Sequence, residues 1–146
     1  MKSQKGFTLV ETFVVIAILV ISVTVAVPQF QRMAQNGNLR AAAKDIMGDF
    51  ANMRGRAMAE NSSYAIVFDQ ANNSYTIPGQ ANPKTPSSFA GDIAITAVSA
   101  TTLTFQTRGT ITPPVEKTLT LTNGRGSTAT ITITTAGRIH VQYNFQ

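Results

Sequence analysis

The hydrophobic positions of this chain follow three successive patterns. Residues 7 to 27 are apolar almost throughout. Between Leu39 and Ala57, apolar residues recur at spacings of three and four, the period of one buried helix face. After Tyr64, short runs alternate between apolar and polar residues, as strands with one buried side do. These patterns predict one long N-terminal helix followed by an antiparallel β domain.

The first apolar run is long enough to cross a membrane. As a helix, residues 7 to 27 would span about 31 Å, close to the roughly 30 Å hydrocarbon core of a bilayer. A secretory signal would have a shorter apolar region and a small-x-small cleavage site, and Pro28 disrupts the nearest candidate. Lys2 and Lys5 precede the run and predict a cytoplasmic N-terminus, with the rest of the chain outside the cytoplasm.

Glu11 is the only charged residue between Lys5 and Arg32. A carboxylate costs roughly 2.5–3.5 kcal/mol at the centre of a membrane helix and less near its end. A buried charge needs a partner, and no cation within the span can reach Glu11, so we expect the partner on another molecule. If a peptidase cut after Gly6, the new α-amino group of Phe7 would lie at nearly the depth of Glu11. In a filament of staggered copies, that amine would pair with the carboxylate of a neighbour and set the axial register.

The segment "KGFTLVETFVVIAILVI", residues 5 to 21, resembles the N-terminal signature of type IV pilins and type II secretion pseudopilins. In that family a prepilin peptidase removes a short basic leader ending in glycine, and the new first residue is N-methylated. The resemblance implies that Gly6 ends the leader, that Phe7 is the mature N-terminus and that Glu11 is the assembly glutamate. Pro28 falls where pilins usually have a helix-kinking proline.

The second half of the predicted helix is amphipathic. Its apolar stripe consists of Leu39, Ala43, Ile46, Phe50, Met53 and Ala57. Polar residues on the other faces are Arg40, Lys44, Asp45, Asp49, Asn52 and Arg56. The stripe fits an interface with neighbouring filament subunits or packing against the chain's own sheet, and we expect the second. The helix should end near residues 61 to 63.

The remaining sequence predicts strands joined by turns. "YAIVF" and "SYTI" flank "DQANN" and indicate a hairpin, and residues 78 to 88 form a loop rich in Pro, Gly, Asn and Ser. "TLTLT" and "TITIT" alternate strictly, which places Leu119, Leu121, Ile131 and Ile133 inward. "NGRGS", residues 123 to 127, joins these two strands as a hairpin turn.

The later segments also resemble one subfamily. "MRGRAMAENSSYAIVF", "FQTRGTITP", "TLTLTNG" and "ITITTAGRIHV" follow the succession found in GspH/FimT-type minor pseudopilins. Major pilins commonly close a C-terminal loop with a disulfide, and this chain has no cysteine. The major type II pseudopilin typically has an acidic calcium loop near its C-terminus, but after Asp92 the only acid is Glu116. The resemblance therefore implies a minor subunit, with a major pilin as the alternative.

Composition gives catalysis little support. One histidine, His140, cannot make a zinc site, and the chain has no cysteine. No local signature gives a serine or threonine nucleophile its base, and the seven acids form no evident pair. We therefore expect a structural protein, not an enzyme, with no metal and no cofactor.

DNA binding is the rival function. The net charge is +5, although only 13% of residues are charged. DNA-binding members of the resembled family carry a C-terminal "GRxR" element, and here Arg138 matches while His140 replaces the second arginine. Arg108 and Arg125 lie in other turns and would add cationic contacts if the turns converged at one end.

The sequence thus predicts an α+β pilin-like chain: a leader (1–6), a transmembrane assembly helix (7–27), its amphipathic continuation (28–60) and an antiparallel β domain (61–146). The expected partners are other pilin or pseudopilin subunits, the prepilin peptidase, the inner membrane and its assembly platform. The expected location is the bacterial inner membrane, single-pass with a periplasmic domain, and then a periplasmic pseudopilus or a surface pilus. The machine it serves (secretion, motility and adhesion, or DNA uptake) stays open.

Overall fold

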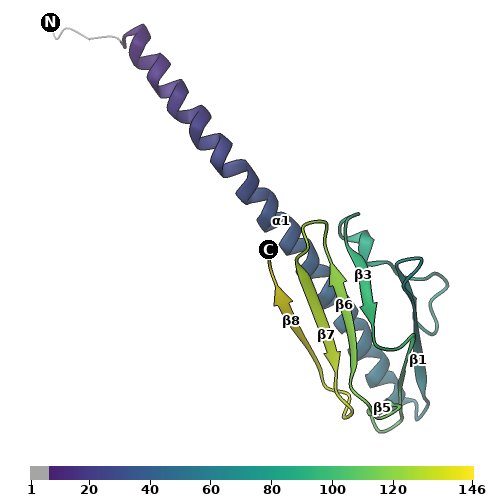
Figure 1. Cartoon of the computed structure of the whole chain (residues 1–146). Helices are drawn as coiled ribbons and strands as arrows, with labels where there is room; N and C mark the ends of the chain where they lie inside the picture. The colour runs from purple at the N-terminus through teal and green to yellow at the C-terminus, as the bar shows by residue number, and fades with distance from the viewer. Residues whose placement is uncertain (1–6) are drawn as a thin grey trace, which may run out of the picture. The chain divides into compact units, whose positions relative to one another are not determined.

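The computed structural model describes residues 7–146. One helix, α1 (Leu9–Ala59), precedes all the strands (Figure 1). The chain forms two compact units, one ending at Ala34 and the other comprising Gln35–Gln146. The strands are β1 (Tyr64–Asp69), β2 (Ser74–Thr76), β3 (Ala94–Val98), β4 (Thr102–Phe105), β5 (Ile111–Thr112), β6 (Lys117–Thr122), β7 (Thr128–Ile133) and β8 (Ile139–Asn144). A short 3₁₀ helix, η1 (Pro86–Ser88), lies between β2 and β3.

The C-terminus of α1 has a local stop signal. The amide of Ser62 donates to the carbonyl of Ala57, and Asn61 between them adopts a positive φ of 49°. This is the arrangement of a Schellman motif, in which asparagine tolerates the left-handed conformation better than most residues. The sequence-based end of the helix is therefore correct to within a few residues.

The β domain consists of two four-stranded sheets. The first has the order β2-β1-β4-β5 and the second β3-β6-β7-β8, and every pair is antiparallel. The predicted hairpins are confirmed: Phe68 pairs with Tyr75 across β1–β2, and Leu119 with Ile131 across β6–β7. The division into two sheets was not apparent from the sequence, because strand patterns do not show which strands pair over a distance.

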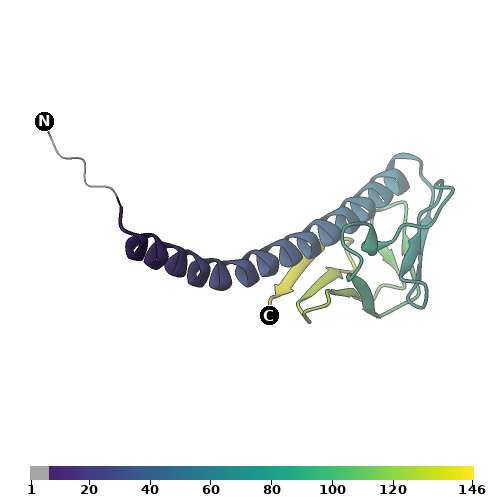
Figure 2. The ribbon, with the colours of Figure 1, turned by 90° about the horizontal axis from the view of Figure 1, so that it is seen from above.

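The core lies between the residue 35–59 part of α1 and the strands, which gather on one side of it (Figure 2). All six residues of the predicted apolar stripe are buried, together with Ala42. Phe50 lies at the centre, with its ring centroid 6.0 Å from that of Phe68 and 6.5 Å from that of Phe105. Truncating such a buried ring to alanine costs about 3–5 kcal/mol. The stripe therefore packs against the chain's own sheets, as expected.

Candidate functional site

The N-terminus of α1 carries a reciprocal hydrogen-bonded cap. The amide of Thr8 donates to Oε2 of Glu11 at 3.2 Å, and the amide of Glu11 donates to Oγ1 of Thr8 at 3.2 Å. Helix residues begin at Leu9, so Thr8 is the N-cap residue and Glu11 the third residue of the helix. This is a capping box, whose Thr-x-x-Glu spacing was visible in the sequence but was not recognised there.

The cap corrects one expectation about Glu11. Its carboxylate does have partners in its own chain, since it also accepts a hydrogen bond from the Thr8 hydroxyl. Within residues 7–146, however, the ion pairs are formed by Arg56 and Lys84, so the negative charge of Glu11 has no cationic partner there. The positive end of the helix dipole stabilises the charge only partly. The carboxylate is therefore held in place at the first turn and remains available to an external cation.

The apolar part of α1 presents its side chains outward. Exposure is 82% at Leu9 and still 47% at Val27, and α1 is long and apolar enough to cross a membrane. The hydroxyls of Ser22 and Thr24 donate to carbonyls one turn back, which satisfies them without water. Pro28 lies inside the helix, where it lacks the amide hydrogen that would otherwise bond one turn back. Such a surface requires lipid or other apolar helices around it.

The predicted processing site lies partly outside the described residues. Phe7 precedes the cap and is 84% exposed. Gly6 belongs to the part of the chain that the structure does not describe, so the expected cleavage point stays a prediction.

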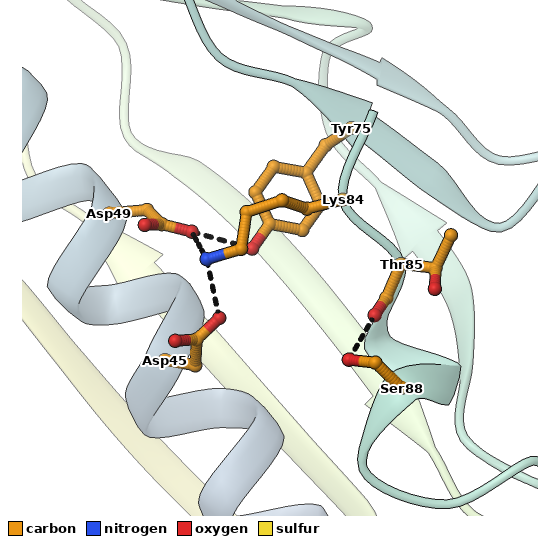
Figure 3. Close-up of polar contacts among 6 residues, drawn as sticks. All are labelled: Asp45, Asp49, Tyr75, Lys84, Thr85 and Ser88. Carbon is orange, nitrogen blue, oxygen red and sulfur yellow. Dashed lines mark hydrogen bonds and ion pairs between the residues drawn. The ribbon is translucent and has the colours of Figure 1, made fainter. Parts of the chain in front are cut away.

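A cluster of four polar side chains ties α1 to the loop after β2 (Figure 3). Nζ of Lys84 lies 2.7 Å from Asp45 and 2.6 Å from Asp49, and the hydroxyl of Tyr75 donates to Asp49 at 2.7 Å. Burial of Lys84 on its own would lower its pKa, but the bonds and charges of Asp45 and Asp49 outweigh burial and raise that pKa. Burial of Tyr75, assisted by Asp49, raises the pKa of its hydroxyl well above its ordinary value. We call these four residues the lysine lock.

Sequence reasoning missed the lysine lock. The loop around Lys84 was predicted only as an exposed connection. The available signal was the pair of acids four residues apart on α1, because residues at that spacing share one helix face and attract a cation. Which cation they attract depends on the fold.

The arginine-bearing turns do not form one patch. The turn with Arg108 and the turn with Arg138 meet, because the amide of Ile111 donates to the carbonyl of Thr135 at 3.2 Å. A Cβ at Gly137 would lie 2.0 Å from the carbonyl oxygen of Gly109, so this contact requires glycine. Nε of Arg54 on α1 also donates to that oxygen at 2.9 Å.

Arg125 lies elsewhere. Its turn precedes β7 and the turn of Arg138 follows β7, so the two turns lie at opposite ends of this strand (Figure 1). A strand of six residues is about 20 Å long. The guanidinium of Arg125 donates to Gln35 on α1 and holds the hairpin against the helix. The condition of convergence is met for the turns of Arg108 and Arg138 but not for that of Arg125, because antiparallel connections alternate between the two ends of a sheet.

Two family models match this architecture. The prokaryotic N-terminal methylation motif matches residues 1–27, and the family of the type II transport protein GspH matches residues 42–137. The chain belongs to the GspH family. It is a minor pilin or pseudopilin, and the resemblance read from its N-terminal and C-terminal motifs is confirmed.

Solved structures show the same fold. The type IV minor pilin FimU of Pseudomonas aeruginosa is 19% identical, with a TM-score of 0.60 over 75% of this chain and 92% of that chain. The minor pseudopilin EpsH from the type 2 secretion system of Vibrio cholerae is 10% identical, with a TM-score of 0.56 over 73% of this chain and 97% of that chain. No curated protein sequence matches the chain significantly. The predicted α+β pilin-like fold is confirmed.

Proposed function

We propose that this GspH-family chain is cleaved after Gly6, is N-methylated at Phe7 and enters a filament through α1. The observation that carries the proposal is the capped Glu11 at the start of an exposed apolar helix. The cap holds the carboxylate close to the residue that becomes the N-terminus. The amine of a neighbouring subunit would then supply the cation that Glu11 does not find among residues 7–146.

The proposed cellular location rests on the charges of the leader and on the apolar helix that follows it. The proposed leader carries Lys2 and Lys5, which favours a cytoplasmic N-terminus and a periplasmic β domain in a single-pass inner-membrane precursor. The prepilin peptidase and the assembly platform would act on this precursor. The mature chain would join either a periplasmic pseudopilus or a surface pilus as a structural subunit without a catalytic role. We do not propose DNA as its ligand, because Arg125 is remote from Arg108 and Arg138.

The test is mass spectrometry of sheared filaments and of membranes from cells carrying the wild-type chain or Glu11→Gln. Glutamine keeps an oxygen that accepts the hydrogen bond from Thr8 but removes the charge. We expect a mature chain beginning at N-methylated Phe7 in both strains. Its amount in filaments should fall about tenfold or more in the variant, the equivalent of one charge-assisted hydrogen bond.

Ser22→Ala is the matched control, because the Ser22 hydroxyl bonds only to its own helix. The control should enter filaments at the wild-type level. Normal incorporation of Glu11→Gln would disprove the charge pairing, and a retained Met1 would disprove the cleavage. The abundant pilin found beside this chain would identify the machine.

A further inference from the structure

The two sheets have four edge strands, and three of them are protected. β2 exchanges two backbone hydrogen bonds with Lys84, each of 2.9 Å. β5 has two residues, and its Ile111 donates to Thr135. The side chain of Gln70 donates to the carbonyl of Thr96 in β3, and the side chain of Asn73 accepts from the amide of Ile95. β3 is also irregular between Ile95 and Ala97. Protection by short length, bulges or side chains is how proteins prevent unwanted strand pairing.

The fourth edge strand, β8, is open. It has six residues and is the last strand in the order β3-β6-β7-β8. It contains no proline, lysine or other residue that commonly blocks an edge.

The ladder shows which backbone groups of β8 are free. Thr134 donates to the carbonyl of Arg138, and the amide of Gln146 donates to Ser127, so these even-numbered residues direct their backbone groups toward β7. In an antiparallel ladder bonded and unbonded residues alternate. Ile139, Val141 and Tyr143 therefore direct their amides and carbonyls outward, where nothing among residues 7–146 bonds to them.

The side chains beside β8 indicate which kind of polypeptide segment could pair with this strand. Val141 and Tyr143 pack against the core but are only half-buried, and Arg40 of α1 lies over the Tyr143 ring. The Tyr143 hydroxyl is buried and, within residues 7–146, has no hydrogen-bond partner. Arg40 of α1 lies 4.6 Å from the Phe145 ring centroid, and exposed Lys44 lies one turn further on the same helix face.

We propose that the outer edge of β8 binds an extended segment of a different filament subunit, which continues the sheet by one strand. The segment would place apolar side chains beside Val141 and Tyr143 and an acidic side chain near Arg40 and Lys44. Main-chain hydrogen bonds would supply affinity, and the alternating side chains would supply specificity. This inference rests on the proposed function, because it requires the chain to be part of a filament.

A second copy of this chain does not fit the edge. Two identical β8 edges would pair antiparallel about a two-fold axis. The residue 35–59 helices of the two copies would then point in opposite directions, whereas subunits drawn from one membrane share one direction. Both sides would also bring Arg40 and Lys44, which would add repulsion.

Amide hydrogen exchange at single-residue resolution tests the edge in the unaltered full chain. It compares the chain in lipid nanodiscs with the chain in sheared filaments. We expect the amides of Ile139, Val141 and Tyr143 to exchange about tenfold or more slowly in filaments, because each gains an acceptor. The amides of His140, Gln142 and Asn144 already bond to β7 and should change little.

Unchanged exchange at Ile139, Val141 and Tyr143 in filaments that contain the chain would overturn this inference alone. Absence of the chain from filaments would overturn the proposed function and this inference with it.

Matched variants test the same edge. Val141→Pro removes one outward amide without touching the β7 ladder, and Val141→Ala keeps the amide but shortens the side chain. We expect the proline variant to reach about a tenth of the alanine variant's level in filaments. Thermal unfolding of both variants in detergent checks that they fold, and equal levels of two folded variants would contradict the proposal.

The identity of the occupant can be read by crosslinking. Because the chain has no cysteine, Gln142→Cys can carry a single benzophenone label, with exposed Thr76→Cys on β2 as the control. We expect the Gln142 label to crosslink to an acid-containing extended segment of a non-identical subunit, which the control does not label. Crosslinks to a second copy of this chain would overturn the proposed partner.

Discussion

At the scale of single residues, Glu11 completes the helix cap and keeps its negative charge. Its carboxylate completes the helix cap with Thr8, which lowers the cost of placing an acid at the end of an apolar helix. The cap does not neutralise the charge. Glu11 therefore caps the first turn of the helix, and its charge stays free for the cation that we propose another subunit supplies.

The cap itself predicts the effect of changing Thr8. Thr8→Ala removes the acceptor for the Glu11 amide, whereas Thr8→Ser keeps it. The alanine variant should lose about 0.5–2 kcal/mol at the helix start, so the Glu11 amide should exchange several-fold faster in nanodiscs. The serine variant should match the wild type. Equal exchange in all three chains would show that the cap contributes nothing in lipid.

At the scale of elements, the lysine lock and the Arg125 contact attach different parts of α1 to the β domain. Asp45 and Asp49 hold Lys84 in the loop after β2, while Gln35 receives Arg125 from the β6–β7 turn. The apolar stripe of the same helix, with Phe50 at its centre, is buried against the sheets. Charged and polar contacts thus set the position of the helix, and apolar burial supplies the larger share of the stability.

The lysine lock predicts a loss of stability in alkaline solution. Above about pH 10 an unfolded chain loses the Tyr75 proton, whereas the folded chain keeps it because the pKa of Tyr75 is raised. The unfolded state then binds fewer protons, so the free energy of unfolding should fall by about 1.4 kcal/mol per pH unit from this group. The raised pKa of Lys84 acts in the same direction above its ordinary value of 10.5.

The measurement is urea unfolding in detergent between pH 8 and 11, with Tyr75→Phe as the comparison. The phenylalanine variant should be less stable at pH 8, because Asp49 loses a donor, but its stability should fall less steeply above pH 10. Parallel curves for the two chains would show that Tyr75 titrates alike in both states.

At the scale of the whole molecule, the two compact units have different requirements. The unit ending at Ala34 exposes its apolar side chains, whereas residues 35–146 contain a closed core of α1 and two sheets. Only the first needs lipid or neighbouring helices. The open β8 edge belongs to the second unit and would give the filament a contact through the β domain.

This division predicts that a fragment of residues 35–146 folds alone in water. Its circular dichroism should show mixed helix and strand, and its unfolding should be a single cooperative transition. The midpoint should lie within about 4 °C of that of the full chain in detergent, since no core residue is lost. A non-cooperative transition would mean that the N-terminal unit contributes to the core.

The sequence by itself determined the long helix, its apolar stripe, the hairpins and the family, because these depend on local periodicity, turn residues and an N-terminal motif. It also contained the Thr8–Glu11 cap, which is a local interaction. The tertiary structure alone decided that Lys84 meets Asp45 and Asp49, that Arg108 lies beside Arg138 but not Arg125, and that β8 is an open edge. Each of these depends on which distant strands pair and at which end of a sheet each turn lies. Local sequence patterns do not specify which strands pair or at which end of a sheet a turn lies.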